Sequence, residues 1–210
     1  MSYTVYGTKG SSNFAIEAAL TIAGAHYDFV DVSLDANAQR EEAFAQINPT
    51  RKIPAMRLPT GEIVTESSAI LMTIADRHPQ KKLLPPAGSA ERAIAFRWVA
   101  FFAAEVYPMV EIVDYPDRFT GRSGNPEETR DLARERVRDR FAIFERGIAG
   151  DPWISSQGFS LADLYAANLT RWSVGKEWRE ANCPKIQKLA KAVAARPDIA
   201  PIWKKHFGDR

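Results

Sequence analysis

The sequence predicts a two-part protein, with a mixed α/β region over residues 1–78 and an all-helical region over residues 90–210. Three observations support this division. Segments rich in β-forming residues alternate with helical patterns only in the first region. Residues 79–89 contain Pro-Pro and Gly-Ser and make the best linker in the chain. Beyond this linker the strand signals stop, and apolar residues recur at helical spacing.

The first region has the element order β-α-β-α-β-β-α. Gly24 ends the first helix where positive φ is needed, and Pro59-Thr60-Gly61 suits a hairpin turn. A mixed sheet flanked by helices in this order is that of a thioredoxin-like domain. The expected strands are 3–6, 26–34, 53–58 and 62–65, and the expected helices are 14–22, 39–46 and one from 66 to Pro79.

The second region reads as a helical bundle. A long helix follows the linker, and Pro108 is expected to kink or end it. Asn125 followed by proline and two glutamates is a well-formed helix start. Residues 160–163, Ser-Leu-Ala-Asp, form a capping motif in which Asp163 replaces the usual glutamate, and we assign it to folding and stability. The last helices hold Ile186, Leu189 and Val193, and then residues 199–207.

Composition argues against several classes of function. The chain has 28 basic and 26 acidic side chains, a net charge of +2, so neither nucleic acid nor an anionic membrane is expected as its partner. Its one cysteine, Cys183, allows no disulfide within the chain and makes a cysteine-based metal site very unpromising. His26, His78 and His206 lack metal-binding spacing, so no metal is expected. No signal peptide and no apolar run of about 20 residues is present, which favours a cytoplasmic protein.

The strongest motif lies between residues 48 and 71. Residues 48–56 read Asn-Pro-Thr-Arg-Lys-Ile-Pro-Ala-Met, and residues 61–71 read Gly-Glu-Ile-Val-Thr-Glu-Ser-Ser-Ala-Ile-Leu. This pair resembles the glutathione-binding core of the glutathione transferases, where NP-x-x-K-[VI]-P-A precedes a hairpin and an E-S-x-A-I helix start. The domain order is also similar. The chain is therefore identified as a soluble-type member of that superfamily, of unassigned class.

The resemblance implies roles for five residues in binding glutathione. Pro54 is expected to follow a cis peptide bond, which turns Ile53 outward so that its N–H and C=O can pair with the cysteinyl unit of the peptide. Ser67 is expected to hold the γ-glutamyl carboxylate at the start of a helix, where free N–H groups favour an anion. Glu66 would take the α-amino group, and Lys52 the glycyl carboxylate. Taken singly, each residue also fits an ordinary loop or first-turn position.

The same resemblance places the thiol-activating group at the first strand–helix junction, residues 6–14. No cysteine occurs there, so an enzyme thiol at this position is excluded. A hydroxyl donor can favour the thiolate by hydrogen-bonding its charged form. The candidates, in order of preference, are Ser12, Ser11 and Asn13. The alternative is that Ser12 or Asn13 is simply the N-cap of the first helix.

The helical region is expected to supply the pocket for a hydrophobic electrophile. The candidate wall residues are Phe102, Tyr107 and Trp172, with Trp178 nearby in sequence, although each also fits a plain core position. The expected function is a glutathione transferase acting in detoxification by conjugation, peroxide reduction or cleavage of an ether or halide. The Gly-Ser-Ser-Asn stretch also resembles bacterial β-etherases.

Two other functions remain open at this stage. One is a non-catalytic module of the same fold that binds apolar ligands or a protein. The other is a glutathione-dependent isomerase, which would carry cysteine where Asn13 stands. The resemblance also implies a homodimer, with Met72 and Phe44 as candidate interface residues.

Overall fold

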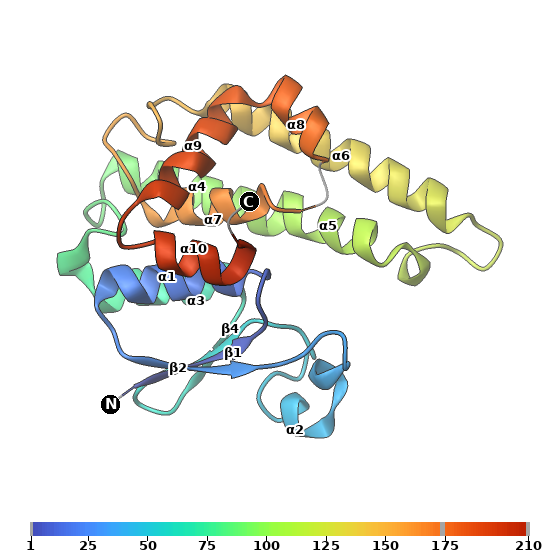
Figure 1. The fold of residues 1–210 in the computed structure, drawn as a ribbon, viewed down its shortest axis with the longest axis horizontal. Helices are drawn as coiled ribbons and strands as arrows, with labels where there is room; N and C mark the ends of the chain where they lie inside the picture. Colours follow the sequence, from blue (N-terminus) through green and yellow to red (C-terminus); the bar gives the residue numbers. More distant parts are fainter. Residues whose placement is uncertain (1, 173–174, 209–210) are drawn as a thin grey trace. The chain divides into compact units, whose positions relative to one another are not determined.

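The computed structural model describes residues 2–172 and 175–208, which divide into two compact units (Figure 1). One unit holds residues up to Pro86 together with the C-terminal stretch from Val193, and the other holds Ala87–Ala192. The boundary after Pro86 falls within the linker expected at 79–89. The C-terminal stretch, however, belongs with the α/β unit, whereas the sequence pattern had grouped it with the helices of 90–210.

Within the described residues, the α/β unit contains one four-stranded sheet of order β2-β1-β3-β4. Strand β1 runs parallel to β2 and antiparallel to β3, and β3 is antiparallel to β4. Side chains alternate along β1, with Tyr3 and Val5 buried and Tyr6 half-buried, as expected for a strand with one face in the core. The strands are β1 (Tyr3–Gly7), β2 (Tyr27–Asp31), β3 (Ala55–Arg57) and β4 (Ile63–Thr65).

Helices α1 (Asn13–Ala23) and α3 (Ser67–Arg77) lie side by side over one face of this sheet (Figure 1). Helix α10 (Ala200–Phe207) packs on α1, and Figure 1 shows it on the side of α1 away from the strands. Almost all of α1 is therefore buried, which explains the alanine-rich, apolar sequence of that helix. Gly24 ends α1 at φ 67°, as predicted.

The expected element order of the α/β unit is confirmed. The one element that differs is the helix expected at 39–46, which splits into a 3₁₀ turn at Ala38–Arg40 and the four-residue α2 (Glu42–Ala45). Phe44 in α2 is buried, with 5% of its surface exposed. Phe44, a candidate interface residue, is therefore enclosed within its own unit and not available to a partner subunit.

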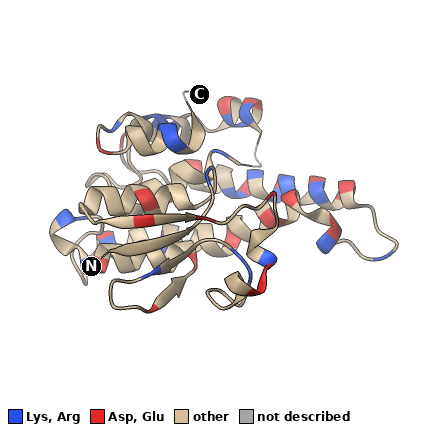
Figure 2. Ribbon diagram, turned by 60° about the horizontal axis from the view of Figure 1, so that its bottom comes forward, with Lys and Arg blue, Asp and Glu red and all other residues tan. Residues whose placement is uncertain are grey.

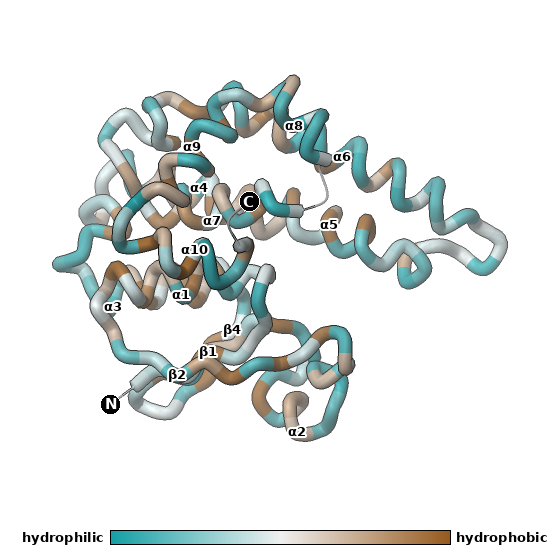
Figure 3. The backbone as a smooth tube through the Cα atoms, in the orientation of Figure 1, coloured by the Kyte–Doolittle hydropathy of each residue, from teal (hydrophilic) through white to brown (hydrophobic). Residues whose placement is uncertain are grey.

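The other unit is helical. Trp98, Phe102 and Phe144 pack ring against ring in its core, and long helix α6 carries mostly hydrophilic residues (Figure 3). Its helices are α4 (Ala90–Phe101), α5 (Tyr107–Asp114), α6 (Pro126–Gly147), α7 (Leu161–Leu169), α8 (Lys176–Asn182) and α9 (Pro184–Ala195), whose last residues belong to the α/β unit. Figure 2 shows basic and acidic residues alternating along α6, so the arginines of this helix do not form a face of one sign.

Of the two outcomes expected at Pro108, a kink or an end of the helix, the end does not occur there. A π-helical turn over Phe102–Val106 joins α4 to α5, and Pro108 is the second residue of α5. A π-turn already departs from the i→i−4 hydrogen-bond ladder, so the missing N–H of proline is tolerated at the start of the next segment.

Among the described residues, the combined segment Ala90–Asp114 is long and apolar enough to cross a membrane by length and composition alone. Its buried residues include Trp98, Val106 and Val110, and its two α-helical parts contact α6 and α7 in the helical unit. One side of this segment is therefore packed within the helical unit.

Candidate functional site

Three segments singled out from the sequence leave the sheet at the same end. Tyr6 pairs with Ala55 across β1 and β3, and Ala55 pairs with Thr65 across β3 and β4. These three residues therefore form one row across the sheet. Along the chain, the junction that leads to α1 follows Tyr6, Pro54 directly precedes Ala55, and Glu66 directly follows Thr65. Tyr6 is thus brought by strand register to the same edge as residues 49 and 59 positions further along the sequence.

At the junction, Asn13 is fully buried and its side chain is used for local structure. Its Nδ2 donates to the carbonyl of Tyr6 at 3.2 Å. Its Oδ1 lies 2.8 Å from Ser11 Oγ. A Cβ atom at Gly7 would lie only 1.8 Å from Asn13 Oδ1, so the glycine is required by this side chain. The geometry assigns Asn13 a structural use as the residue that closes the junction.

Ser11 and Ser12 differ in how their hydroxyl groups are used. Ser11 Oγ lies 2.6 Å from the carbonyl of Thr8 and also accepts the Asn13 N–H at 3.3 Å. Its single proton is directed back into its own loop, either to Thr8 or to Asn13 Oδ1. Ser12 occupies the N-cap position of α1 and is 4% exposed, but its side chain makes no capping hydrogen bond. Ser12 therefore stands at the N-cap position of α1, but its side chain does not cap the helix.

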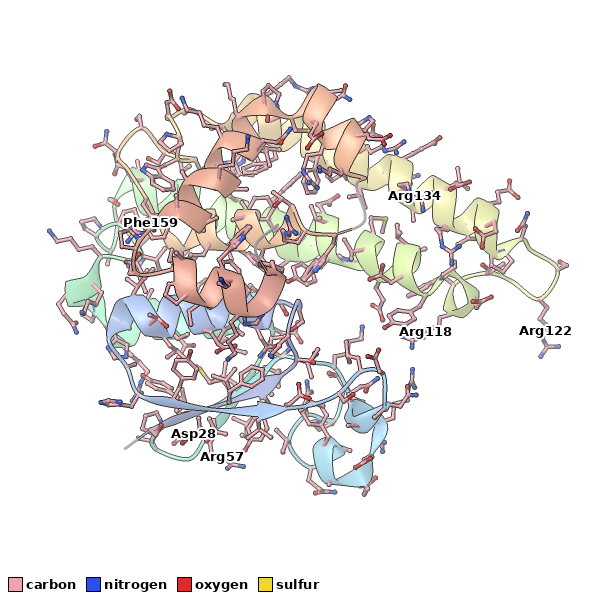
Figure 4. All side chains as sticks on the ribbon, viewed as in Figure 1. Asp28, Arg57, Arg118, Arg122, Arg134 and Phe159 are labelled. Carbon is pink, nitrogen blue, oxygen red and sulfur yellow. The ribbon has the colours of Figure 1, made fainter. Side chains whose placement is uncertain are left out.

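Two other candidate nucleophiles or donors are placed elsewhere. The Tyr6 hydroxyl accepts from Arg57 Nε at 3.4 Å, and Figure 4 shows Arg57 on the side of the sheet away from α1. Cys183 is fully buried in the helical unit, where burial and the nearby Glu145 raise its pKa to about 11. A thiol with such a pKa is almost entirely protonated near neutrality and is a poor nucleophile.

The loop before β3 is shaped by Asn48. Its Nδ2 donates to the carbonyl of Lys52 at 2.6 Å, and its Oδ1 accepts the Thr50 N–H at 3.1 Å. The peptide bond between Ile53 and Pro54 is cis, as predicted. Lys52 is exposed, Ile53 is half-buried and Pro54 is buried. Asn48 is the first residue of the sequence motif, but its part in holding the loop was not predicted.

Glu66 has an unusual backbone conformation at the N-cap of α3. Its φ of 64° and ψ of 116° lie outside the regions that residues with a Cβ readily adopt. Such a conformation costs about 1–3 kcal/mol and is commonly found at binding sites, where the surroundings hold it in place. Ser67 follows as the first helical residue and is 7% exposed. The start of α3 therefore presents first-turn N–H groups beside a constrained glutamate, a setting suited to a carboxylate ligand.

A buried cluster that the sequence did not predict lies next to this edge. Glu17 of α1 is fully buried and accepts from Tyr27 Oη at 2.9 Å, from His206 Nε2 at 2.7 Å and from Lys205 Nζ. Burial alone would raise the pKa of Glu17. The hydrogen bonds from His206 and Lys205, together with the positive charge of Lys205, outweigh burial and lower the pKa of Glu17 below its ordinary value. Burial and the neighbouring Glu17 also raise the pKa of Tyr27 to about 12.

Of the residues expected to line a second pocket, two come together in the helical unit. The ring of Tyr107 lies 5.4 Å from that of Trp172, edge to face, and stacks on Tyr165. Phe102 is 2% exposed and enclosed by core rings, so we treat it as a core residue and do not carry it into the pocket. Trp178 lies on α8 under the guanidinium group of Arg138. No group of three or more metal-ligating side chains occurs within residues 2–172 and 175–208.

The capping motif at residues 160–163 is confirmed. Asp163 is fully buried, and its two carboxylate oxygens accept the backbone N–H groups of Ile154 at 2.8 Å and Ser160 at 2.7 Å. Burial raises the pKa of Asp163 to about 6 in spite of these hydrogen bonds. The residue lies in a closed environment, which agrees with its assignment to folding.

Comparison with known proteins decides the family. Residues 1–76 match the glutathione S-transferase N-terminal domain, and residues 93–197 match the glutathione S-transferase C-terminal domain. The chain belongs to the glutathione S-transferase family. Its α/β unit is thioredoxin-like, and the following helical region is the second domain of that family, as the sequence predicted.

Individual relatives cover nearly the whole chain. An uncharacterized GST-like protein of Escherichia coli, YncG, is 31% identical over 203 residues, which are 96% of this chain and 97% of that protein. A glutathione transferase homologue from Sulfitobacter, solved with bound glutathione, has a TM-score of 0.89 at 25% identity and covers 97% of this chain and 98% of the other. A sphingomonad glutathione S-transferase complexed with glutathione has a TM-score of 0.79 at 28% identity, covering 96% and 97%.

Proposed function

We propose that this glutathione S-transferase family member binds glutathione at the edge of its sheet and directs the thiolate at a small hydrophobic electrophile. The observation that carries the proposal is the constrained Glu66 immediately before the buried Ser67. Glu66 follows Thr65, and the cis Ile53–Pro54 bond precedes Ala55, which pairs with Thr65. A plain scaffold needs neither feature. Two relatives of known structure, described above, contain glutathione.

The binding roles follow the geometry of that edge. The half-buried Ile53 offers its backbone to the cysteinyl unit in the manner of an added strand. The hydroxyl and N–H of Ser67 hold the γ-glutamyl carboxylate, and the exposed Glu66 takes the α-amino group. Lys52 is exposed and reaches the glycyl carboxylate.

Ser12 is our candidate for activating the thiol. Its side chain is not used to cap α1, whereas Ser11 and Asn13 hydrogen-bond within the junction. A hydroxyl that donates to the sulfur stabilises the thiolate over the thiol and lowers the pKa of bound glutathione from an ordinary thiol value of about 8.5. Tyr107 and Trp172 remain the candidates for contacting the electrophile. The reaction is a displacement or addition in which the sulfur forms the new bond and the electrophile supplies the leaving group or acceptor.

Calorimetry with glutathione tests the binding site. We expect wild-type protein to bind glutathione with a dissociation constant between micromolar and millimolar. Ser67→Ala should weaken binding by about 1–3 kcal/mol, because a charged acceptor loses its partner. Ser68→Ala, one position further along α3 and half-buried, is the matched control and should bind as the wild type does. Absence of binding by the wild type at high millimolar glutathione would reject the proposal in favour of a non-catalytic module.

Thiolate absorbance tests the activating residue. Ser12→Ala should raise the pKa of bound glutathione and lower turnover of an activated aryl halide by roughly tenfold to a hundredfold, with little effect on glutathione affinity. Ser11→Ala is the matched comparison and should disturb the loop without selectively changing thiol ionisation. If Ser11→Ala shows the selective loss and Ser12→Ala does not, the role passes to Ser11.

We also propose that the protein forms a two-fold dimer, as the family resemblance implies. The half-buried Met72 on α3 stays a candidate for that interface, while Phe44 does not.

A further inference from the structure

A hydrogen bond that could not be predicted from the sequence joins the C-terminal helix α10 to the candidate thiol-activating loop. His206 lies 3.2 Å through Nδ1 from the backbone nitrogen of Gly10, 196 positions away in sequence. Gly10 has a φ of 75° and stands two residues before Ser12. The contact therefore acts on the backbone that positions the Ser12 hydroxyl.

The direction of this hydrogen bond fixes the form of the imidazole ring. The Gly10 N–H can only donate, so Nδ1 of His206 must be the unprotonated, accepting nitrogen. The other nitrogen, Nε2, lies 2.7 Å from Glu17 Oε1 and donates its proton there. Both ring nitrogens are thereby used, and the carboxylate sets which one carries the proton.

Packing holds the ring in this place. The His206 side chain is fully buried, and Phe14 of α1 lies edge-on to the rings of both Trp203 and His206, with centroids 5.1 Å and 5.8 Å away. Glu17 also receives Tyr27 and Lys205, so the carboxylate cannot readily turn away from His206. A fixed acceptor on a packed helix is a rigid support for a glycine loop.

We propose that His206 is a positioning residue for the reaction: held by Glu17, it fixes the Gly10–Ser12 backbone so that the Ser12 hydroxyl faces the glutathione sulfur. The inference rests on the proposed function, because it concerns the geometry of the same site. His206 acts through Gly10 and does not touch the sulfur.

Substitutions of His206 can separate the effects of its two hydrogen bonds, to Gly10 and to Glu17. In His206→Asn, the amide oxygen occupies the place of Nδ1 and can accept from Gly10, but the side chain is too short to reach Glu17. In His206→Gln, the amide occupies the place of Nε2 and can donate to Glu17, while the acceptor for Gly10 is lost. Lys205→Met removes a different partner of Glu17 and leaves the Gly10 contact in place.

We expect His206→Gln to lower kcat and the fraction of bound glutathione present as thiolate about five- to tenfold, the loss of one hydrogen bond. Its dissociation constant for glutathione, measured by calorimetry, should stay within about twofold, because Ile53 and Ser67 are untouched. Lys205→Met should keep kcat within about twofold, whereas His206→Asn, which keeps the acceptor for Gly10 but loses Glu17, should lower kcat less than His206→Gln does; both variants lower stability. An equal loss of kcat in the Asn and Gln variants, following their melting temperatures, would show a structural role alone and overturn the proposal.

Nuclear magnetic resonance of the wild type gives a test that needs no variant to fold. Long-range proton–nitrogen spectra at neutral pH should show His206 neutral with its proton on Nε2, and the Gly10 amide should be protected from solvent exchange. A proton on Nδ1 would overturn the proposal. Failure of the wild type to bind glutathione in calorimetry rejects the proposed function instead, so the two failures are distinguishable.

Discussion

Glu17 on α1 and Asp163 on α7 are both fully buried carboxylates, yet their pKa values shift in opposite directions. Burial raises the pKa of each group. Glu17 accepts hydrogen bonds from His206 and from the charged Lys205, and these outweigh burial and leave the pKa of Glu17 below its ordinary value. Asp163 faces two backbone N–H groups and the Ser160 hydroxyl, and its pKa rises to about 6. Neutral donors satisfy a buried carboxylate without compensating fully for its lost hydration.

The difference reflects what each carboxylate does in the fold. Asp163 closes a local turn, joining the first residues of α7 to the segment around Ile154. Glu17 joins segments far apart in sequence, since its partners lie on β2 and α10. A local cap can be built from backbone donors that are already nearby. A contact between elements far apart in sequence needs long side chains as donors, and one of these, Lys205, carries a positive charge.

The comparison predicts the largest effect for truncation of the cap. Asp163→Ala should lower the free energy of unfolding by about 3–5 kcal/mol, because two buried backbone N–H groups lose their acceptor. Urea denaturation followed by circular dichroism measures this loss. Asp139→Ala, at an exposed position on α6, is the matched control and should change stability by less than about 0.5 kcal/mol. A loss below about 1 kcal/mol at Asp163 would mean that water replaces the carboxylate.

The raised pKa of Asp163 predicts a pH effect of known sign. Between its ordinary value of 3.8 and about 6, the folded protein holds a proton that the unfolded chain has released, so the contribution of Asp163 to stability falls as pH rises. The full change is roughly 3 kcal/mol. Asp163→Asn cannot titrate, so the stability advantage of the wild type over this variant should shrink from about pH 4 to about pH 7. Parallel pH profiles for the two proteins would contradict the shift.

Much of the α/β unit could be predicted because its signals are local. Gly24 was recognised from its helix-ending position, and the cis bond before Pro54 from its motif, and both are confirmed. The π-turn before Pro108 was not predicted, because a lone proline does not reveal it. The four-residue α2 was overestimated because apolar spacing over so short a segment does not distinguish a helix from successive turns.

The glutathione-binding residues of the candidate site could be predicted from the sequence, but the side chains that hold the site in place could not. Residues 48–71 carry a continuous motif, so the glutathione-binding side could be named from sequence. The hydrogen bonds of Ser11 and Asn13 depend on how the junction folds back on Tyr6, which no spacing rule describes. Glu17 and His206 were missed because a single glutamate in one helix and a histidine in another carry no signal that they meet. Only the packing of α10 on α1 joins them.

Glu17→Gln gives the smallest effect and tests the opposite side of the comparison. The amide oxygen can still accept from His206 Nε2 and the amide nitrogen can donate to the Tyr27 hydroxyl, but the side chain has no charge for Lys205. The Lys205 side chain is 34% exposed, so its ammonium group can be hydrated when the carboxylate is lost. We therefore expect a loss of about 1–2 kcal/mol at neutral pH, below that of a fully enclosed ion pair.

The pH dependence of this variant should run opposite to that of Asp163→Asn. The folded pKa of Glu17 lies below its ordinary value of 4.5, so its contribution is complete above that value and is lost as pH falls through the folded pKa. The stability deficit of Glu17→Gln should shrink on acidification, measured by urea denaturation between about pH 5 and about pH 3. Glu135→Gln on the exposed face of α6 serves as the control. A deficit that grew on acidification would mean that Glu17 is held as the neutral acid, and the two carboxylates would then differ only in their partners and not in their charge.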